Sequence, residues 1–195
     1  MRTPVKVKIC GLTRREDVES AVAAGADYLG FVLVPESKRF VPPERRRALV
    51  ADLPAEVKSV AVVADPTEDE LSEIRKLFDI IQFHDHEPPD LADGERSWKA
   101  LPASAAPAEF ARYRVGHFVV DSERGGSGQC CDWRLAARAA ERYEILLAGG
   151  LSPGNVAEAV RQVNPWGVDV AGGVELSPGI KSAEKIQLFI KEAKS

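Results

Sequence analysis

The sequence has few cysteines, no long basic tract and no apolar run long enough to cross a bilayer. Its three cysteines are Cys10, Cys130 and Cys131, and an odd number with two adjacent excludes a readable disulfide framework and favours a reducing compartment. The apolar stretch at 28–34 is too short for a membrane span. Basic residues gather only at 45–47 and the formal net charge is −4, which argues against nucleic acid as a partner.

Charged residues near the N-terminus occupy the place where a secretory signal would carry its apolar run. Arg2, Lys6 and Lys8 lie within the first eight residues, so we expect a cytoplasmic protein that does not act on a membrane. At 195 residues, with 45% hydrophobic and 29% charged residues, the chain has the composition of a globular protein. The length suits a single domain over residues 1–195.

Short β-branched runs alternate with segments of helical period along the chain. Strands are predicted at Val5–Cys10, Tyr28–Val34, Val57–Val63, Ile80–Phe83, near Ser97–Leu101, and at Val115–Asp121, Glu144–Ala148 and Gly167–Val170. Helices are predicted after Thr13 and after Thr67, at Pro43–Leu53, near Ala106–Tyr113, and at Asp132–Arg142, Asn155–Val163 and Ala183–Lys194. Capping boxes begin at Thr13 and Thr67, and Ser152-Pro153 predicts a third helix start.

Eight strands alternating with helices predict an α/β fold, a compact (βα)8 barrel of the TIM type with some helices shortened. Shortening is expected because 195 residues leave only about 24 for each unit, against roughly 250 in a typical barrel. An open doubly wound sheet is the alternative. It would favour a glycine-rich turn after the first strand, and the turn at 10–13 lacks that pattern.

Glycine pairs follow the last two predicted strands. Gly149-Gly150 and Gly172-Gly173 stand in similar sequence contexts one βα unit apart. Paired glycines allow backbone amides to approach a phosphate, and barrels commonly bind phosphate after these two strands. Two tight turns requiring positive φ are the alternative interpretation.

Two side chains capable of proton transfer end predicted strands. Asp121 ends the sixth strand and precedes Gly125–Gly128, a loop with the composition of a lid. Position alone leaves Asp121 equally open to a turn-forming role. Cys10 ends the first strand, where it is either a small core residue or a thiolate that acts as base or nucleophile.

Polar residues after the second and fourth strands are further candidates. Arg39 has the planar fork that recognises carboxylates, although a solvated loop charge would fit the same position. Gln82 and His84 end the fourth strand, and from the residues alone His84 fits a surface turn better. The adjacent spacing of residues 84–86 does not predict a metal site.

Several motifs recur in order along the chain, and they resemble the family of phosphoribosylanthranilate isomerases. They are Lys8–Thr13, Gly25–Phe31, Ser37–Phe40, Gln82–His84, Gly125–Gly128, Asp132-Trp133, Leu147–Leu151, Gly167–Val170, Gly173–Glu175 and Pro178-Gly179. Only residues 85–114 lie outside the resemblance. The opening Lys-Ile-Cys-Gly motif is specific to this family among phosphate-binding barrels.

The resemblance implies an Amadori rearrangement of N-(5-phosphoribosyl)anthranilate in tryptophan biosynthesis, without metal or organic cofactor. It makes Asp121 the general acid that protonates the furanose ring oxygen, and Cys10 the general base that removes the C2 proton. Arg39 would hold the anthranilate carboxylate and the two glycine pairs the phosphate. The remaining substrate-binding residues implied are Gln82, His84, Gly126 and Asp169.

Two other functions stay open from the sequence. One is a degenerate barrel that binds a phosphorylated ligand without turnover, since Ala171-Gly172 stands where the family has hydroxyl-bearing residues. Backbone amides remain there, so we expect phosphate binding to survive. The other is a different phosphosugar isomerase, although a paired-Asp enzyme would want a carboxylate in place of Cys10. The expected partner is a phosphorylated small molecule, bound by a monomer or a homodimer.

Overall fold

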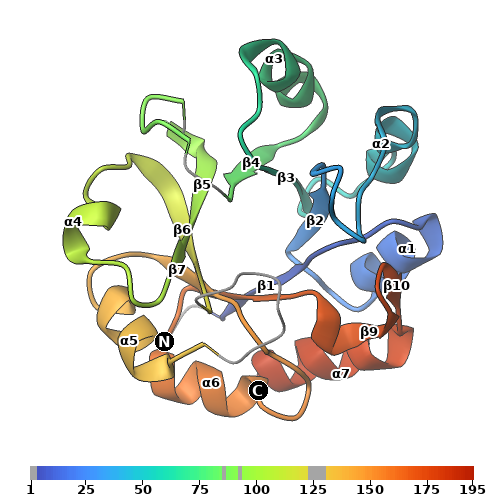
Figure 1. The fold of residues 1–195 in the computed structure, drawn as a ribbon. Helices are drawn as coiled ribbons and strands as arrows, with labels where there is room; N and C mark the ends of the chain where they lie inside the picture. Colours follow the sequence, from blue (N-terminus) through green and yellow to red (C-terminus); the bar gives the residue numbers. More distant parts are fainter. Residues whose placement is uncertain (1–3, 85–86, 92–93, 123–130) are drawn as a thin grey trace.

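The chain forms a closed barrel of eight parallel strands that pair in sequence order, as predicted (Figure 1). The computed structural model describes residues 4–84, 87–91, 94–122 and 131–195. The barrel closes where the first strand pairs with the eighth, with Lys8 beside Asp169. The strands are β1 Lys6–Ile9, β2 Tyr28–Val32, β3 Lys58–Val63, β4 Ile80–Phe83, β5 Gly94–Pro102, β6 Val115–Asp121, β7 Ile145–Leu147 and β8 Gly167–Val170.

Helices surround the barrel (Figure 1). They are α1 Arg15–Ala23, α2 Pro43–Val50, α3 Glu68–Leu77, α4 Pro107–Phe110, α5 Trp133–Ala140, α6 Val156–Val163 and α7 Ala183–Ala193. Between β8 and α7 the chain adds a 3-10 turn, η1 Gly172–Val174, and a hairpin of β9 Glu175–Ser177 and β10 Ile180–Lys181. None of the helices in the described ranges is long and apolar enough to span a bilayer.

Each strand sends alternate side chains toward the helices and toward the barrel interior. Leu29 and Phe31 of β2 are fully buried in the cluster that includes the helical residue Val18. Gly30 lies between them and pairs with Val60, which belongs to a separate cluster inside the barrel. Apolar residues on both faces are what a buried parallel strand requires, and they explain the continuous apolar runs in the sequence.

Aromatic side chains fill the N-terminal end of the barrel interior. The Trp98 ring packs 4.9 Å from the Tyr28 ring and 5.4 Å from the His117 ring, measured between centroids. Trp166 covers His117 at 3.7 Å. Burial lowers the pKa of His117, and neither ring nitrogen has a hydrogen-bond partner among the described residues. This end of the barrel is therefore a packed floor.

The fifth unit is the most reduced part of the barrel. The strand expected near 97–101 is present and longer than predicted, whereas the helix expected near 106–113 is reduced to α4. No helix occurs in the described residues between β4 and β5. The outer face of β5 instead carries Lys99, which forms a buried ion pair with Glu87 at 2.7 Å. In place of a helix, this ion pair lies against the outer face of β5.

Of the three predicted helix N-caps, the structure confirms one. Thr67 and Glu70 form the predicted capping box at α3. The Thr13 hydroxyl does not cap α1; it donates to the Gly179 carbonyl oxygen at 2.6 Å. Residues 152–153 form a turn before α6 and do not start the helix. The two wrong predictions concern loops at the C-terminal end of the barrel. Thr13 bonds a residue far away in the sequence, and Ser152 bonds Asn155 through its backbone amide.

Candidate active site

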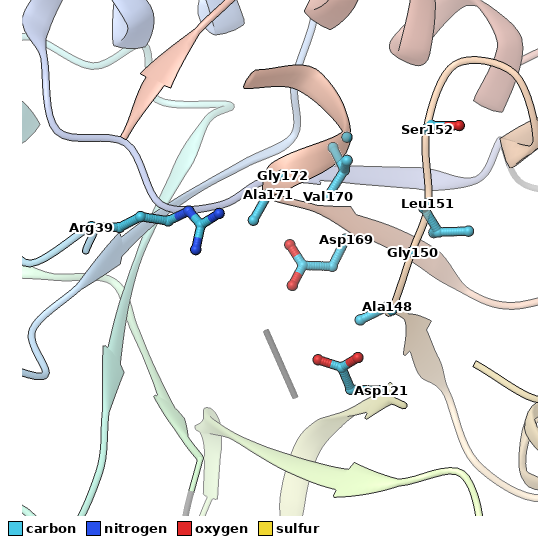
Figure 2. A pocket seen from close by; sticks show the side chains of 12 residues that line it. Arg39, Asp121, Ala148, Gly150, Leu151, Ser152, Asp169, Val170, Ala171 and Gly172 are labelled. Carbon is cyan, nitrogen blue, oxygen red and sulfur yellow. The ribbon is translucent and has the colours of Figure 1, made fainter. Parts of the chain in front are cut away.

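A cavity of about 460 Å³ opens at the C-terminal end of the barrel strands (Figure 2). It is lined by Arg39, Asp121, Ala148, Gly149, Gly150, Leu151, Ser152, Asp169, Val170, Ala171, Gly172 and Gly173. These residues end strands β6 and β8 or follow strands β2, β7 and β8. Active sites of such barrels lie at this end.

Asp121 is the last residue of β6, and its carboxylate points into the cavity (Figure 2). Its Oδ1 accepts hydrogen bonds from the Ser122 backbone at 2.6 Å and the Ser122 hydroxyl at 3.2 Å. Gly149 has a φ of 83°, and a Cβ there would lie 2.7 Å from that oxygen. Only glycine therefore leaves room for the Asp121 carboxylate in this position.

Asp169 lies on β8, two strands from Asp121 in the barrel, and pairs with a fully buried lysine. Both Asp169 oxygens accept from Lys8 Nζ at 3.1 Å, and the Lys8 side chain has no exposed surface. Burial raises the pKa of Asp169, the charge of Lys8 opposes this, and the nearby Asp121 carboxylate adds to it. Burial alone would lower the pKa of Lys8, but Asp169 and Cys10 together raise it.

Cys10 follows β1 and is 8% exposed. It does not line the cavity and lies beside the pair formed by Lys8 and Asp169. A Cβ built on the inward-facing Gly30 would lie 2.8 Å from Cys10 Sγ and 3.1 Å from Lys8 Cε, so sulfur and lysine share the barrel interior. Burial raises the pKa of the Cys10 thiol, Lys8 lowers it, and Asp169 raises it again. Arg39 also lies near this thiol.

Arg39 reaches the cavity from the loop after β2, and it is not a solvated loop charge. Its Nε donates to Glu175 Oε1 at 2.8 Å, and its Nη2 donates to Glu175 Oε2 at 2.7 Å. Glu175 opens β9, and its side chain is 6% exposed. Burial alone would raise the pKa of Glu175, but the hydrogen bonds from Arg39 and Lys181 bring it below its ordinary value.

The first glycine pair forms a backbone-lined wall of the cavity. Gly150 has a φ of 65°, in the left-handed region that favours glycine. Asn155 holds the loop closed, because its side chain accepts from the Ser152 amide at 2.8 Å and donates to the Gly150 carbonyl at 3.0 Å. The turn geometry and the cavity wall are thus made by the same residues.

The second glycine pair begins the turn η1 and packs directly on the first loop. A Cβ on Gly173 would collide with the carbonyl oxygen of Leu151. The two loops therefore approach backbone to backbone, which places both glycine pairs around one space. Backbone amides at such a place, next to the N-terminus of α6, can bind an anion.

The other predicted residues lie outside the cavity wall. Gln82 is 3% exposed on β4 and pairs in register with Trp98 of the interior cluster. Its Oε1 has no hydrogen-bond partner among the described residues. His84 is exposed and lines a separate cavity of about 160 Å³ together with Lys99. Gly126 falls outside the described residues.

Three charged residues of the site were missed from the sequence. Lys8 alternates with the apolar residues Val7 and Ile9 and belongs to the motif Lys8–Thr13, which could have marked it. Glu175 closes the motif Gly173–Glu175, which could have marked it. Lys181 follows in a segment without clear periodicity, so the sequence gives no signal for it. Within the described ranges, no group of three or more His, Cys, Asp or Glu residues is arranged to hold a metal.

Comparison with known proteins places this site in a family context. A family model described as N-(5'phosphoribosyl)anthranilate (PRA) isomerase matches residues 7–192. The N-(5'-phosphoribosyl)anthranilate isomerase of Geobacter metallireducens is 41% identical over 98% of this chain and 100% of its own length. The phosphoribosyl anthranilate isomerase structure from Thermus thermophilus superposes with a TM-score of 0.87 at 36% identity, covering 96% of this chain and 98% of its own.

A further similar structure contains a ligand. It is a phosphoribosyl anthranilate isomerase in complex with reduced 1-(o-carboxyphenylamino)-1-deoxyribulose 5-phosphate. Its TM-score is 0.83 at 32% identity, and the match covers 97% of this chain and 98% of that chain.

Proposed function

The chain belongs to the family of N-(5'-phosphoribosyl)anthranilate isomerases, enzymes of tryptophan biosynthesis, and we propose that Asp121 and Cys10 carry its reaction. The reaction is an Amadori rearrangement of an aminoaldose to 1-(2-carboxyphenylamino)-1-deoxyribulose 5-phosphate. The bond between C1 and the ring oxygen breaks, a proton leaves C2, and the C2 hydroxyl becomes a ketone while C1 gains a hydrogen. The oxidation of C2 and the reduction of C1 balance within one molecule.

The substrate is oriented by its two anionic ends. The phosphate lies against the amides of Gly149, Gly150, Gly172 and Gly173, where two loops meet beside the N-terminus of α6. The anthranilate carboxylate lies at Arg39, whose Nη2 would be 3.6 Å from a Cβ on Gly172. This arrangement puts the ribose between Asp121 and Asp169, and the support for it is that all these groups line one cavity of about 460 Å³.

Asp121 is the general acid. Its carboxyl group protonates the ring oxygen, the C1–O bond breaks, and the aniline nitrogen lone pair forms the Schiff base. The backbone and hydroxyl of Ser122 hold Oδ1 in a fixed orientation.

Cys10 is the general base. The iminium withdraws electrons from C2, so a moderate base such as a thiolate is sufficient to remove its proton. The electrons of the C2–H bond then form the enamine. Burial raises the pKa of the Cys10 thiol above its ordinary value, and the charges of Lys8 and Arg39, which lie near the sulfur, oppose this shift. Asp169 lies close enough to Cys10 to affect its pKa and also lines the cavity. There it contacts the sugar hydroxyls.

Gln82 and His84 complete the proposed substrate contacts. The unpartnered Oε1 of Gln82 lies inside the barrel and accepts a hydrogen bond once substrate is bound. His84, which lines the separate cavity after β4, is proposed as a further substrate contact. Gly126 is proposed as a further substrate contact.

Residues 1–195 act as one catalytic domain in this proposal, because barrel closure requires both β1 and β8. The enzyme is cytoplasmic, like the pathway that supplies its substrate, and works as a monomer or a homodimer. Light scattering of the purified chain distinguishes the two assemblies.

The observation that carries the proposal is the convergence of Asp121, Arg39 and both glycine pairs on one cavity in a chain of this family. Freshly prepared phosphoribosylanthranilate should lose its anthranilate fluorescence when the enzyme is added. Inorganic phosphate should compete. Phosphate binding without fluorescence decay at micromolar enzyme would identify the chain as a binding protein and contradict the proposal.

A further inference from the structure

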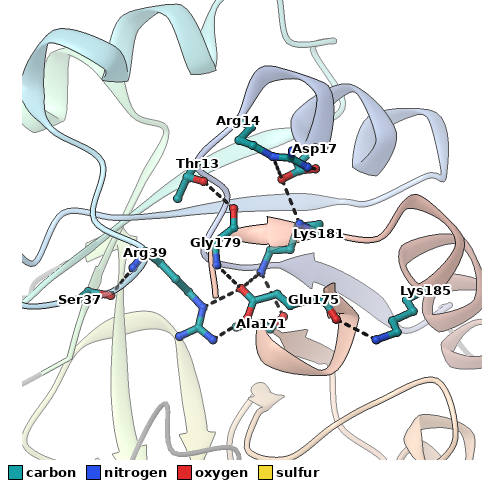
Figure 3. Close-up of polar contacts among 10 residues, drawn as sticks. All are labelled: Thr13, Arg14, Asp17, Ser37, Arg39, Ala171, Glu175, Gly179, Lys181 and Lys185. Carbon is teal, nitrogen blue, oxygen red and sulfur yellow. Dashed lines mark hydrogen bonds and ion pairs between the residues drawn. The ribbon is translucent and has the colours of Figure 1, made fainter. Parts of the chain in front are cut away.

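We propose that Glu175 is a positioning residue that decides which edge of the Arg39 guanidinium meets the substrate. The inference rests on the proposed function, in which Arg39 binds the anthranilate carboxylate. Glu175 itself does not line the cavity. It acts through Arg39, with which it forms two hydrogen bonds (Figure 3).

The two hydrogen bonds occupy one edge of the Arg39 guanidinium and leave the other edge available for a ligand. Glu175 occupies Nε and one hydrogen of Nη2, at 2.8 and 2.7 Å. Among the described residues Nη1 makes no hydrogen bond, so the edge formed by Nη1 and the second hydrogen of Nη2 remains available. This edge matches the spacing of two carboxylate oxygens. Figure 2 shows the guanidinium directed into the cavity.

Glu175 is held in place by donors other than Arg39. Its Oε1 also accepts from Lys181 Nζ at 2.9 Å and from the Gly179 backbone at 3.1 Å. The Lys181 side chain is fully buried, and its backbone amide donates to Asp17 Oδ2 at 3.1 Å (Figure 3). The carboxylate therefore cannot turn away from Arg39 without leaving buried donors unpaired, which is costly.

The path of the Arg39 side chain is also restricted. A Cβ on Gly11 would collide with Arg39 Cδ, so the aliphatic stem lies directly on the β1–α1 loop. The backbone amide of Arg39 donates to Ser37 Oγ at 3.1 Å and fixes the start of the side chain. With both ends of the side chain fixed, the guanidinium presents one orientation to a ligand.

The same cluster balances charge and touches the phosphate loop. Arg39 and Lys181 carry two positive charges against one negative charge on Glu175, which leaves one to be neutralised by a single substrate carboxylate. Lys181 Nζ also donates to the Ala171 carbonyl at 3.1 Å, next to Gly172. Glu175 thus sets the geometry of the carboxylate site relative to the phosphate site, and selects substrates that carry both groups.

The experiment compares two substrates on a set of variants. One is phosphoribosylanthranilate and the other is its analogue made from aniline, which lacks the carboxylate; turnover is followed by chromatography. Glu175→Gln should raise KM for the carboxylate substrate by about 10-fold, with kcat changed less, because a hydrogen bond to a charged group is misdirected. Its kcat/KM for the aniline analogue should stay within about 2-fold of the wild type.

Arg39→Gln and the double variant separate this inference from the proposed function. Arg39→Gln should lose activity on the carboxylate substrate selectively, and adding Glu175→Gln to it should cause no further selective loss. An Arg39→Gln variant that treats both substrates alike would refute the carboxylate assignment and the inference with it. A selective Arg39→Gln beside a Glu175→Gln that impairs both substrates equally would refute the inference alone.

Two controls keep the test valid. Glu184→Gln, at the exposed start of α7, makes the same chemical change away from the cluster and should leave both substrates unaffected. If Glu175→Gln does not fold, judged by circular dichroism, Glu175→Asp keeps the charge but is too short to reach Arg39 and Lys181 together. It should give the same loss on the carboxylate substrate only, and an equal loss on both substrates would overturn the inference.

Discussion

The two ends of the barrel interior are built from different chemistry. At the N-terminal end Tyr28, Trp98, His117 and Trp166 pack ring against ring. At the C-terminal end the interior carries charged side chains: Lys8 on β1, Asp121 on β6 and Asp169 on β8. One end contributes packing energy, and the other holds buried charges that are costly unless they are paired.

The comparison teaches that residues within one strand serve different ends of the barrel. On β6, His117 lies in the aromatic floor and Asp121 lies four residues further in the cavity wall. Substitutions at the two ends should therefore separate stability from activity. The three predictions that follow test this separation.

The largest effect is expected from the two proton-transfer residues. Cys10→Ser and Asp121→Asn should each lower kcat by at least about 10²-fold, the usual contribution of a general acid or base. Their thermal unfolding should change little by comparison, because both replacements are close in volume. Turnover near the wild-type value in either variant would remove that residue from its proposed role.

The next effect concerns the ionisation of Cys10. The positive charge of Lys8 lowers the pKa of the Cys10 thiol, and the negative charge of Asp169 raises it. Lys8→Met should therefore shift the alkaline rise in thiol reactivity to higher pH, and Asp169→Asn should shift it to lower pH. Lys8→Met should also reduce kcat/KM at pH 7 by roughly 10-fold, less than loss of the base itself.

Iodoacetamide alkylation of Cys10 as a function of pH measures both shifts. It is done in a background in which Cys130 and Cys131 are replaced by serine. The double variant Lys8→Met/Asp169→Asn removes both members of the buried pair and serves as the control for an unpaired charge. Shifts in the same direction for the two single variants would contradict the proposed electrostatics.

The smallest effect is expected at the aromatic floor. Burial lowers the pKa of His117 in the folded protein below its unfolded value of 6.5. The unfolded chain therefore binds more protons, and stability is lost as the pH falls below 6.5 toward the folded pKa. His117→Phe should remove this part of the acid sensitivity in urea unfolding between pH 7 and 5, with kcat unchanged. An identical pH dependence in both proteins would contradict it.

Local patterns in the sequence were sufficient for much of the fold. The alternation of apolar strands with helical segments determined the eight-stranded barrel, and the Thr67 capping box was found as predicted. The glycine pairs were correctly placed at one cavity because each follows a strand end. These signals depend on residues close together in the sequence, so they can be read without the tertiary structure.

Closure of the barrel determined which side chains pair across long distances in the sequence. Lys8 meets Asp169 across 161 residues, and Arg39 meets Glu175 across 136. Thr13 binds Gly179 in place of capping its own helix. Such pairings depend on which strand ends come together and on how little water reaches them. The partners of a charged residue in a strand or loop are therefore set by tertiary structure, while its presence there is set by the sequence.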